Sequence, residues 1–174
     1  MEPARARIVV VGGGQAGASL VARLRALGHA GPLTLVGAEV DPPYQRPPLS
    51  KAYLKGEMAR ERLYLRPGSF YAAEGIELVL GMPAAAIDRA AREVLLADDR
   101  RLPFDMLALA TGATPRRLPP AFGGALGGVL SMRSLADADA LAGRLEKGAR
   151  ALVVGGGYIG LEAAAVLSGA GLAV

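Results

Sequence analysis

Short apolar runs alternate along the chain with segments of helical periodicity, which is the pattern of an α/β protein. The apolar run 7–11 leads into a glycine-rich turn, and apolar residues at helical spacing then predict a helix over 15–27 that ends at Gly28. A second apolar run at 33–37 predicts the next strand. The length of the crossover suits parallel pairing of the two strands.

The middle of the chain predicts further strands of two kinds. Residues 76–80 are predicted to form a strand, and 84–88 and 93–96 are predicted to be short antiparallel strands inserted over one face of a parallel sheet. The apolar run 104–110 predicts a buried strand, followed by small residues that allow a ligand to approach the backbone.

The last third repeats the opening order of elements. Residues 114–128 are rich in proline and glycine and read as a linker, and a helix is predicted over 134–147. Its cap is Ser134, with Asp137 at capping-box spacing. The run 151–154 then predicts a strand that enters another glycine-rich turn and helix.

The fold class predicted from this order is α/β, with two Rossmann-like dinucleotide-binding units that have parallel sheets, and a small antiparallel insertion. The expected domains are 1–113 and 114–174, and both units are expected to be truncated at their C-terminal end.

The first turn places Gly12, Gly14 and Gly17 at the G-x-G-x-x-G spacing of a dinucleotide site. The three glycines would form the tight turn, admit a pyrophosphate to the backbone and let the helix pack on the strand. A turn that needs glycine for steric reasons alone has the same spacing. In a dinucleotide fold the end of the second strand supplies a carboxylate for the ribose, and Glu39 is the candidate; the alternative is an ordinary loop carboxylate.

The second turn repeats the spacing at Gly155, Gly157 and Gly160. Two fingerprints predict two nucleotides, one a resident cofactor and one an exchangeable substrate. An internal repeat whose glycines serve packing alone is the alternative.

The segment 41–51 holds four prolines and reads as a stiff, extended or turned loop. Ser50 is predicted to cap a short helix that begins at Lys51, and Arg46 and Lys51 would face whatever the loop covers. A proline-rich linker that exposes two cations is an equal alternative.

Composition excludes several functions. The 174 residues contain no cysteine, so thiolate metal sites and a dithiol redox centre are absent, and a cytoplasmic location is favoured. The single histidine, His29, reads as an exposed structural residue, and no metal site is expected. The net charge of +4 is not concentrated into a basic run, which argues against nucleic acid. The apolar segment 151–174 is interrupted by Glu162 and dense in glycine, so no membrane span is expected.

Four motifs together resemble a known family. They are the first turn, Pro43-Tyr44-Gln45-Arg46-Pro47-Pro48-Leu49-Ser50-Lys51, Ala110-Thr111-Gly112-Ala113 and Gly155-Gly156-Gly157-Tyr158-Ile159-Gly160-Leu161-Glu162. They are similar to the FAD-dependent ferredoxin reductases that serve oxygenases, the putidaredoxin-reductase-like branch of the pyridine nucleotide-disulfide oxidoreductase superfamily. The resemblance implies a hydride passed from NAD(P)H to FAD, and single electrons passed on to a ferredoxin or rubredoxin-type protein. Lack of cysteine fits this branch rather than its disulfide-reducing relatives.

The resemblance also implies site residues. FAD would be held by the first turn, the proline loop and residues elsewhere in the chain, namely Gly12, Gly14, Gln15, Ala16, Gly17, Ala38 or Glu39, Arg46, Lys51, Ala84, Ala110, Thr111, Gly112, Arg116 and Arg133. The second turn would hold NAD(P)H, through Gly155, Gly157, Tyr158, Ile159, Gly160 and Glu162. Family members usually have an acidic residue directly after the strand-end glycine, but this chain has Ala38 there, and Glu39 follows.

Lys51 and Glu162 are the catalytic pair that the resemblance implies. The lysine would stabilise negative charge on a reduced flavin, and the carboxylate would keep it oriented. We expect the two side chains to lie within ion-pair distance. The resemblance further implies that the family continues beyond Val174, so the alternative is a catalytically inert nucleotide-binding fragment with exposed sheet edges. The choice between NADH and NADPH stays open.

Overall fold

The computed structural model describes residues 5–174, which form two compact units. One unit holds the chain up to Gln45 together with Tyr64–Gly112, and the other holds Arg46–Leu63 and Ala113–Val174. The units part after Gly112, one residue before the expected domain boundary. The segment 46–63, expected with the first domain, instead packs in the second unit. The assignment of the two domains to FAD and NAD(P)H stays a prediction.

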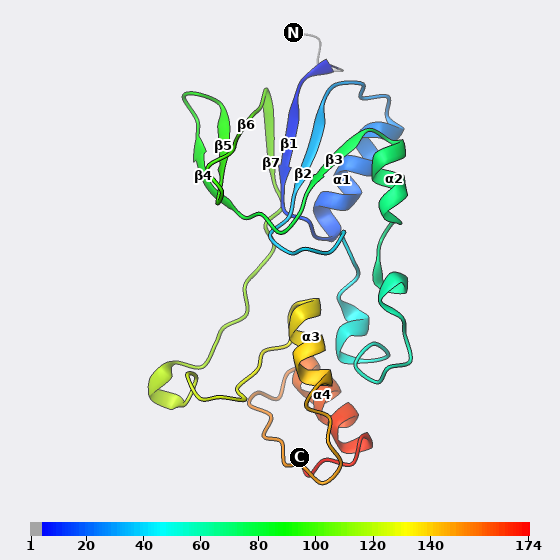
Figure 1. Cartoon of the computed structure of the whole chain (residues 1–174), viewed down its shortest axis with the longest axis vertical. Helices are drawn as coiled ribbons and strands as arrows, with labels where there is room; N and C mark the ends of the chain where they lie inside the picture. Colours follow the sequence, from blue (N-terminus) through cyan, green and yellow to red (C-terminus); the bar gives the residue numbers. More distant parts are fainter. Residues whose placement is uncertain (1–4) are drawn as a thin grey trace. The chain divides into compact units, whose positions relative to one another are not determined.

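The first unit is built on a four-stranded parallel sheet. Its strands are β1 (Ile8–Val11), β2 (Leu33–Val36), β3 (Ile76–Val79) and β7 (Met106–Leu109), in the order β3-β2-β1-β7 (Figure 1). Helix α1 (Gln15–Ala26) connects β1 to β2, as predicted. The strands and the parallel crossover predicted for this part of the chain are thereby confirmed.

Both faces of this sheet are covered, which is why all four residues of β1 are buried. Helices α1 and α2 (Gly68–Ala73) cover one face (Figure 1). Alternate strand residues point to them, and the core there contains Ile8, Val10, Val21, Leu33, Leu35, Tyr71 and Ile76.

The opposite face is covered by the small antiparallel sheet that the sequence predicts. It consists of β4 (Ala84–Asp88), β5 (Glu93–Leu96) and β6 (Arg101–Pro103). A second core cluster lies beneath it and contains Val9, Val11, Val36, Val79, Val94 and Leu96. Because side chains alternate along a strand, β1 supplies residues to both clusters.

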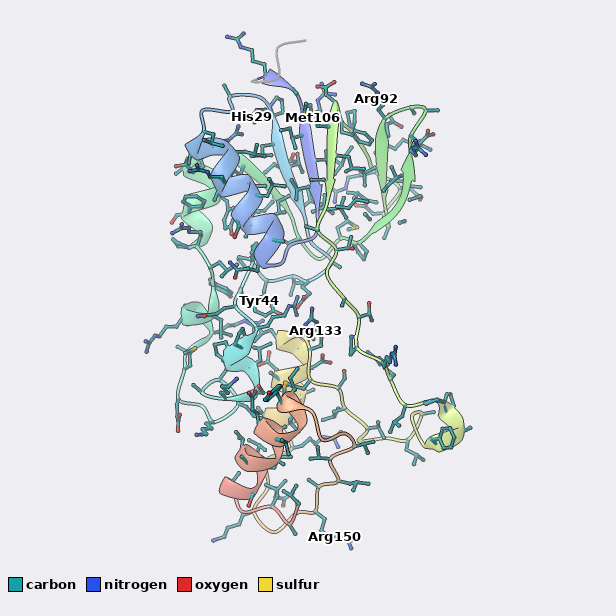
Figure 2. The ribbon with its side chains drawn as sticks, turned by 180° about the vertical axis from the view of Figure 1, so that it is seen from behind. His29, Tyr44, Arg92, Met106, Arg133 and Arg150 are labelled. Carbon is teal, nitrogen blue, oxygen red and sulfur yellow. The ribbon has the colours of Figure 1, made fainter. Side chains whose placement is uncertain are left out.

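Two expectations about burial in this unit are wrong. The sequence predicts a buried strand at 104–110, but β7 is an edge strand, and Met106 and Leu109 are 49% and 62% exposed. Met106 stands at the start of this edge strand (Figure 2). His29, expected on the surface, is 8% exposed, and its backbone N–H donates to the carbonyl of Leu24 while its own carbonyl accepts from Arg25.

The second unit is mainly helical. It contains helices α3 (Leu135–Ala142) and α4 (Tyr158–Gly169). It also contains the short 3₁₀ helices η2 (Pro47–Ser50), η3 (Arg60–Leu63) and η4 (Pro120–Phe122). Helix η2 packs against both α3 and α4, which explains why 46–63 belongs to this unit. The buried side chains include Leu49, Leu54, Leu63, Leu135, Ala138, Val166 and Leu167.

Helix α3 and the strand expected at 151–154 differ from their predictions. The capping box of Ser134 and Asp137 is confirmed, but the helix ends at Ala142 rather than Lys147 because Gly143 follows as its C-cap. A single parallel bridge joins Arg150, just before the run 151–154, to Ala173. The run itself forms no regular strand, and Leu152 is 89% exposed.

Within the described part of the chain, no helix combines the length and the apolar character that crossing a membrane requires.

Candidate functional site

Gly12 directly follows β1 and has a backbone conformation that other residues rarely adopt. Its φ is +127°, and a Cβ at this position would lie 2.1 Å from the carbonyl oxygen of Ala110. The tight turn therefore requires glycine. It also brings the end of β1 against the end of β7, so two of the predicted segments, the first turn and 110–112, lie together.

Gly14 and Gly17 have different surroundings. Gly14 is the N-cap of α1, and no atom of the described residues outside its chain neighbours lies within 4 Å of a Cβ built there. At Gly17 a Cβ would lie 2.0 Å from the carbonyl oxygen of Gly12. Gly17 thus lets the helix pack on the turn, whereas Gly14 leaves the backbone open beside Gln15 and Ala16, both exposed in the first helical turn. An anion is stabilised at such a helix start.

The second turn repeats this backbone geometry, although a Cβ on Gly155, unlike one on Gly12, would meet no atom of the described residues within 4 Å. Gly155 has a φ of +114°, Gly157 is the open N-cap of α4, and a Cβ on Gly160 would lie 2.3 Å from the carbonyl oxygen of Gly155. Tyr158 and Ile159, in the first turn of α4, are 88% and 49% exposed. The helix start is open here as well, so the two turns agree in backbone geometry as well as in spacing.

The end of β2 lies beside the first turn, since a Cβ on Gly13 would lie 3.1 Å from the Cα of Gly37. Ala38 is exposed, and the half-buried Glu39 accepts a hydrogen bond from the hydroxyl of Tyr44. Glu39 is therefore the carboxylate at this strand end, and its predicted contact with a ribose is untested.

Lys51 and Glu162 form the ion pair that we expected. The Nζ of Lys51 lies 2.8 Å from Oε1 of Glu162, and the side chains are 51% and 30% exposed. The other carboxylate oxygen, Oε2, accepts a hydrogen bond of 2.6 Å from the hydroxyl of Ser50. The hydrogen bonds from Lys51 and Ser50 hold the pKa of Glu162 below its ordinary value.

The expectation that Ser50 caps a helix beginning at Lys51 is wrong. Ser50 is the last residue of the 3₁₀ helix Pro47–Ser50, and its hydroxyl serves Glu162 instead of a backbone N–H. The reason lies in the two prolines: their fixed φ and missing N–H suit the first positions of a helical turn, so the turn begins before Ser50 rather than after it.

Arg46 and Arg133, both implied by the resemblance, also meet. Nη1 of Arg46 donates to the carbonyl oxygen of Arg133 at 2.8 Å, just before α3 (Figure 2 labels Arg133). Asp137 fixes this segment, because its carboxylate accepts from the N–H groups of Arg133 and Ser134. Burial alone would raise the pKa of Asp137, but these hydrogen bonds and that from Ser131 outweigh it and lower the pKa.

The remaining predicted residues are divided between the units. Ala84, half-buried at the start of β4, and the exposed Thr111 and Gly112 lie in the first unit. Arg116 is exposed in the second, where Arg46, Lys51, Arg133 and Glu162 also lie.

A second group of side chains, centred on the carboxylate of Asp139, was not predicted from the sequence. Asp139 of α3 accepts from the hydroxyl of Tyr53 at 2.6 Å and pairs with Arg60 at 3.0 Å. Burial, and then Asp139, raises the pKa of Tyr53. Tyr53 and Arg60 are 86 and 79 positions away from Asp139, so no local sequence pattern predicts the cluster. Together with Glu162, it ties the segment 46–63 to both helices.

Comparisons with known proteins identify the family of the chain. The family model of the pyridine nucleotide-disulphide oxidoreductases matches residues 6–174. A probable ferredoxin reductase of Castellaniella defragrans is 46% identical over 168 residues, which are 97% of this chain and 41% of that protein. Putidaredoxin reductase of Pseudomonas putida is 46% identical over 160 residues, covering 91% of this chain and 38% of that protein.

A solved structure gives the same result. The crystal structure of a covalent complex of putidaredoxin reductase and putidaredoxin superposes with a TM-score of 0.90 at 44% identity, over 96% of this chain and 40% of that one. The chain thus spans about two fifths of the length of the relatives it matches. Matched along almost all of its sequence, it belongs to the pyridine nucleotide-disulphide oxidoreductase family.

Proposed function

We propose that the chain functions as an FAD-dependent oxidoreductase. It passes a hydride from NAD(P)H to flavin, and then single electrons to a ferredoxin-type iron–sulfur protein of an oxygenase system. The observation that carries the proposal is the agreement of the two glycine turns. Both have a first glycine at positive φ, an open second glycine at the helix N-cap and a third that packs against the first. Two such turns suit one resident and one exchangeable dinucleotide.

The residues of the first turn fit an FAD pyrophosphate. Gly14 leaves open the space that a phosphate needs, while Gly12 and Gly17 are positions where a Cβ would collide with backbone oxygen. Backbone N–H groups and the dipole of α1 would then bind the phosphates. The second turn fits NAD(P)H in the same way through Gly157 and α4.

Lys51 and Glu162 would work beside the flavin. Bound FAD supplies the conversion between two-electron and one-electron transfer. In the proposal the Lys51 ammonium offers positive charge to a reduced, negatively charged ring, and Glu162 restricts the lysine to one direction. The low pKa of Glu162 keeps it ionised at neutral pH, as an orienting counter-ion must be.

The acceptor follows from the relatives, whose names describe ferredoxin and putidaredoxin reductases. A ferredoxin-type protein is the acceptor we propose, with a rubredoxin-type protein as the alternative that the resemblance leaves open. A cytoplasmic location is part of the same proposal, because NAD(P)H is an intracellular electron donor.

The test is spectroscopic. The purified chain is mixed with FAD, freed of excess flavin and treated anaerobically with NADH or NADPH. The proposal expects yellow protein whose flavin band bleaches with one of the two donors and returns when an oxidised ferredoxin is added. Yellow protein that neither donor bleaches would favour the alternative of an inert nucleotide-binding chain. Colourless protein that binds no FAD would contradict the proposal for this chain.

A further inference from the structure

We propose that Ser50 is a positioning residue that fixes the carboxylate of Glu162 so that one oxygen faces Lys51. Its consequence for flavin reduction rests on the proposed function, but the positioning itself is a property of this chain. Each oxygen of the Glu162 carboxylate has a different partner. Oε2 accepts from the Ser50 hydroxyl at 2.6 Å, and Oε1 lies 2.8 Å from the Lys51 Nζ.

Of the two donors, Ser50 is the rigid one. It is 5% exposed and ends the turn Pro47–Ser50, in which two prolines fix the backbone. Lys51 N and Tyr53 N both donate to the carbonyl of Pro48 at 3.0 Å, which holds the chain on either side of the Lys51 side chain. A serine has one side-chain torsion before its oxygen, so a hydroxyl on this turn has a nearly fixed position.

Lys51, in contrast, is a long side chain that is half exposed. A lysine ammonium on a flexible four-carbon stem does not impose a direction on a carboxylate. The orientation of Glu162 must then come from Ser50, and the direction of Lys51 follows from Glu162. The carbonyl of Pro47, 3.3 Å from the Lys51 Nζ, completes the arrangement.

The charged groups around Glu162 allow the role of Ser50 to be measured through the titration of Glu162. Lys51 is the charged group that faces Glu162 from the segment packed on α4, and Tyr158, one turn earlier on α4, is 88% exposed. The two aspartates of α3 have other partners: Asp137 serves its own helix cap, and Asp139 serves Tyr53 and Arg60. A change in the titration of Glu162 therefore reports on Ser50 and Lys51.

The experiment is a double-mutant cycle read by carboxyl ¹³C NMR on the chain without cofactor. The Glu162 signal is assigned with E162Q, and its pKa is measured in native protein, S50A, K51M and S50A/K51M. If Ser50 directs Glu162 toward Lys51, S50A raises the pKa toward the ordinary glutamate value of about 4.3. K51M then raises it less in the S50A background than in the native one.

Two controls separate positioning from a general effect. Y53F removes another hydroxyl that donates to a carboxylate at 2.6 Å, but that carboxylate is Asp139, so the Glu162 titration should not change. Backbone amide spectra of each variant show that the fold is retained. Equal pKa rises for K51M in both backgrounds would overturn the proposal, because Ser50 and Lys51 would then act independently.

The outcome is independent of whether the proposed reaction occurs. If the chain binds no FAD, the proposed function fails while the NMR cycle still decides the role of Ser50. If flavin is bound and bleached but the cycle is additive, the positioning fails while the proposed function stands. In flavin-loaded protein, S50A is expected to slow bleaching by NAD(P)H without weakening FAD binding, and S50T to restore part of the rate.

Discussion

Gly17 faces the carbonyl oxygen of Gly12 so closely that a Cβ on Gly17 would lie 2.0 Å from it. Gly160 has the same relation to Gly155, at 2.3 Å. In both turns the third glycine serves packing, whereas the second serves an open surface. The two roles can therefore be separated by mutation.

G17A is expected to destabilise the first unit by about 3 kcal/mol or more, because the added methyl meets backbone oxygen that cannot move without shifting β1. Unfolding by urea, followed by circular dichroism because the chain has no tryptophan, measures this change.

G14A is the matched control. Gly14 has a φ of −92°, which alanine adopts, and its Cβ would enter open space. Its cost in stability should stay below about 1 kcal/mol, while FAD affinity falls about ten-fold, or about 1.4 kcal/mol. Equal stability losses for the two variants would contradict the separate roles.

The pair of Lys51 and Glu162 makes the free energy of unfolding depend on pH in the acid range. The pKa of Glu162 is lower in the folded chain than in the unfolded one, so its contribution is complete above the unfolded value of about 4.3 and is lost as the pH falls through the folded value. The stability difference between native protein and E162Q should be small, because the pair is partly exposed. Near neutral pH the difference should be constant. It should then shrink in acid. Thermal unfolding across the acid range checks this, and a difference that grew on acidification would have the wrong sign.

Sequence reasoning succeeds where a feature depends on neighbouring residues. The glycine turns do so, because the clash of Gly17 with Gly12 arises within one strand–turn–helix unit. The Ser134 capping box is local in the same way. The Lys51–Glu162 pair spans the chain, and it was expected only because the motifs resemble those of a family.

Features that depend on distant partners could not be predicted. Strand β7 has an apolar sequence whether it lies inside a sheet or at its edge, and only the strand order decides its exposure. The sequence predicts a cap at Ser50 because capping is the commonest local use of a serine. Its actual acceptor, Glu162, is 112 positions away, and no periodicity connects them.

Arg25 is predicted to hold the loops at one end of the first unit together. Its guanidinium donates to the carbonyl oxygens of Glu74, His29, Gly31 and Gly75 at 2.7–2.8 Å. R25M should cost about 2–4 kcal/mol in unfolding free energy, since a charged donor and four acceptors lose their bonds. R25K should recover less than half, because an ammonium lacks the planar fork. R23M, on an exposed residue of the same helix, should change stability by about 0.5 kcal/mol at most.

The edge strand β7 is expected to promote self-association. It pairs with β1 on one side, and among the strands of residues 5–174 none pairs with its other side, where Leu109 is 62% exposed. An unpaired strand edge with apolar side chains can add a strand from another chain, and a lysine there opposes this. L109K should weaken association by about ten-fold, or about 1.4 kcal/mol, in sedimentation velocity over a concentration series. L27K is the control, because Leu27 is equally exposed (67%) but follows a helix, and it should leave association unchanged. Equal effects of the two lysines would mean that general surface charge controls the association. A native chain that stays monomeric at every concentration would contradict the prediction that β7 promotes self-association.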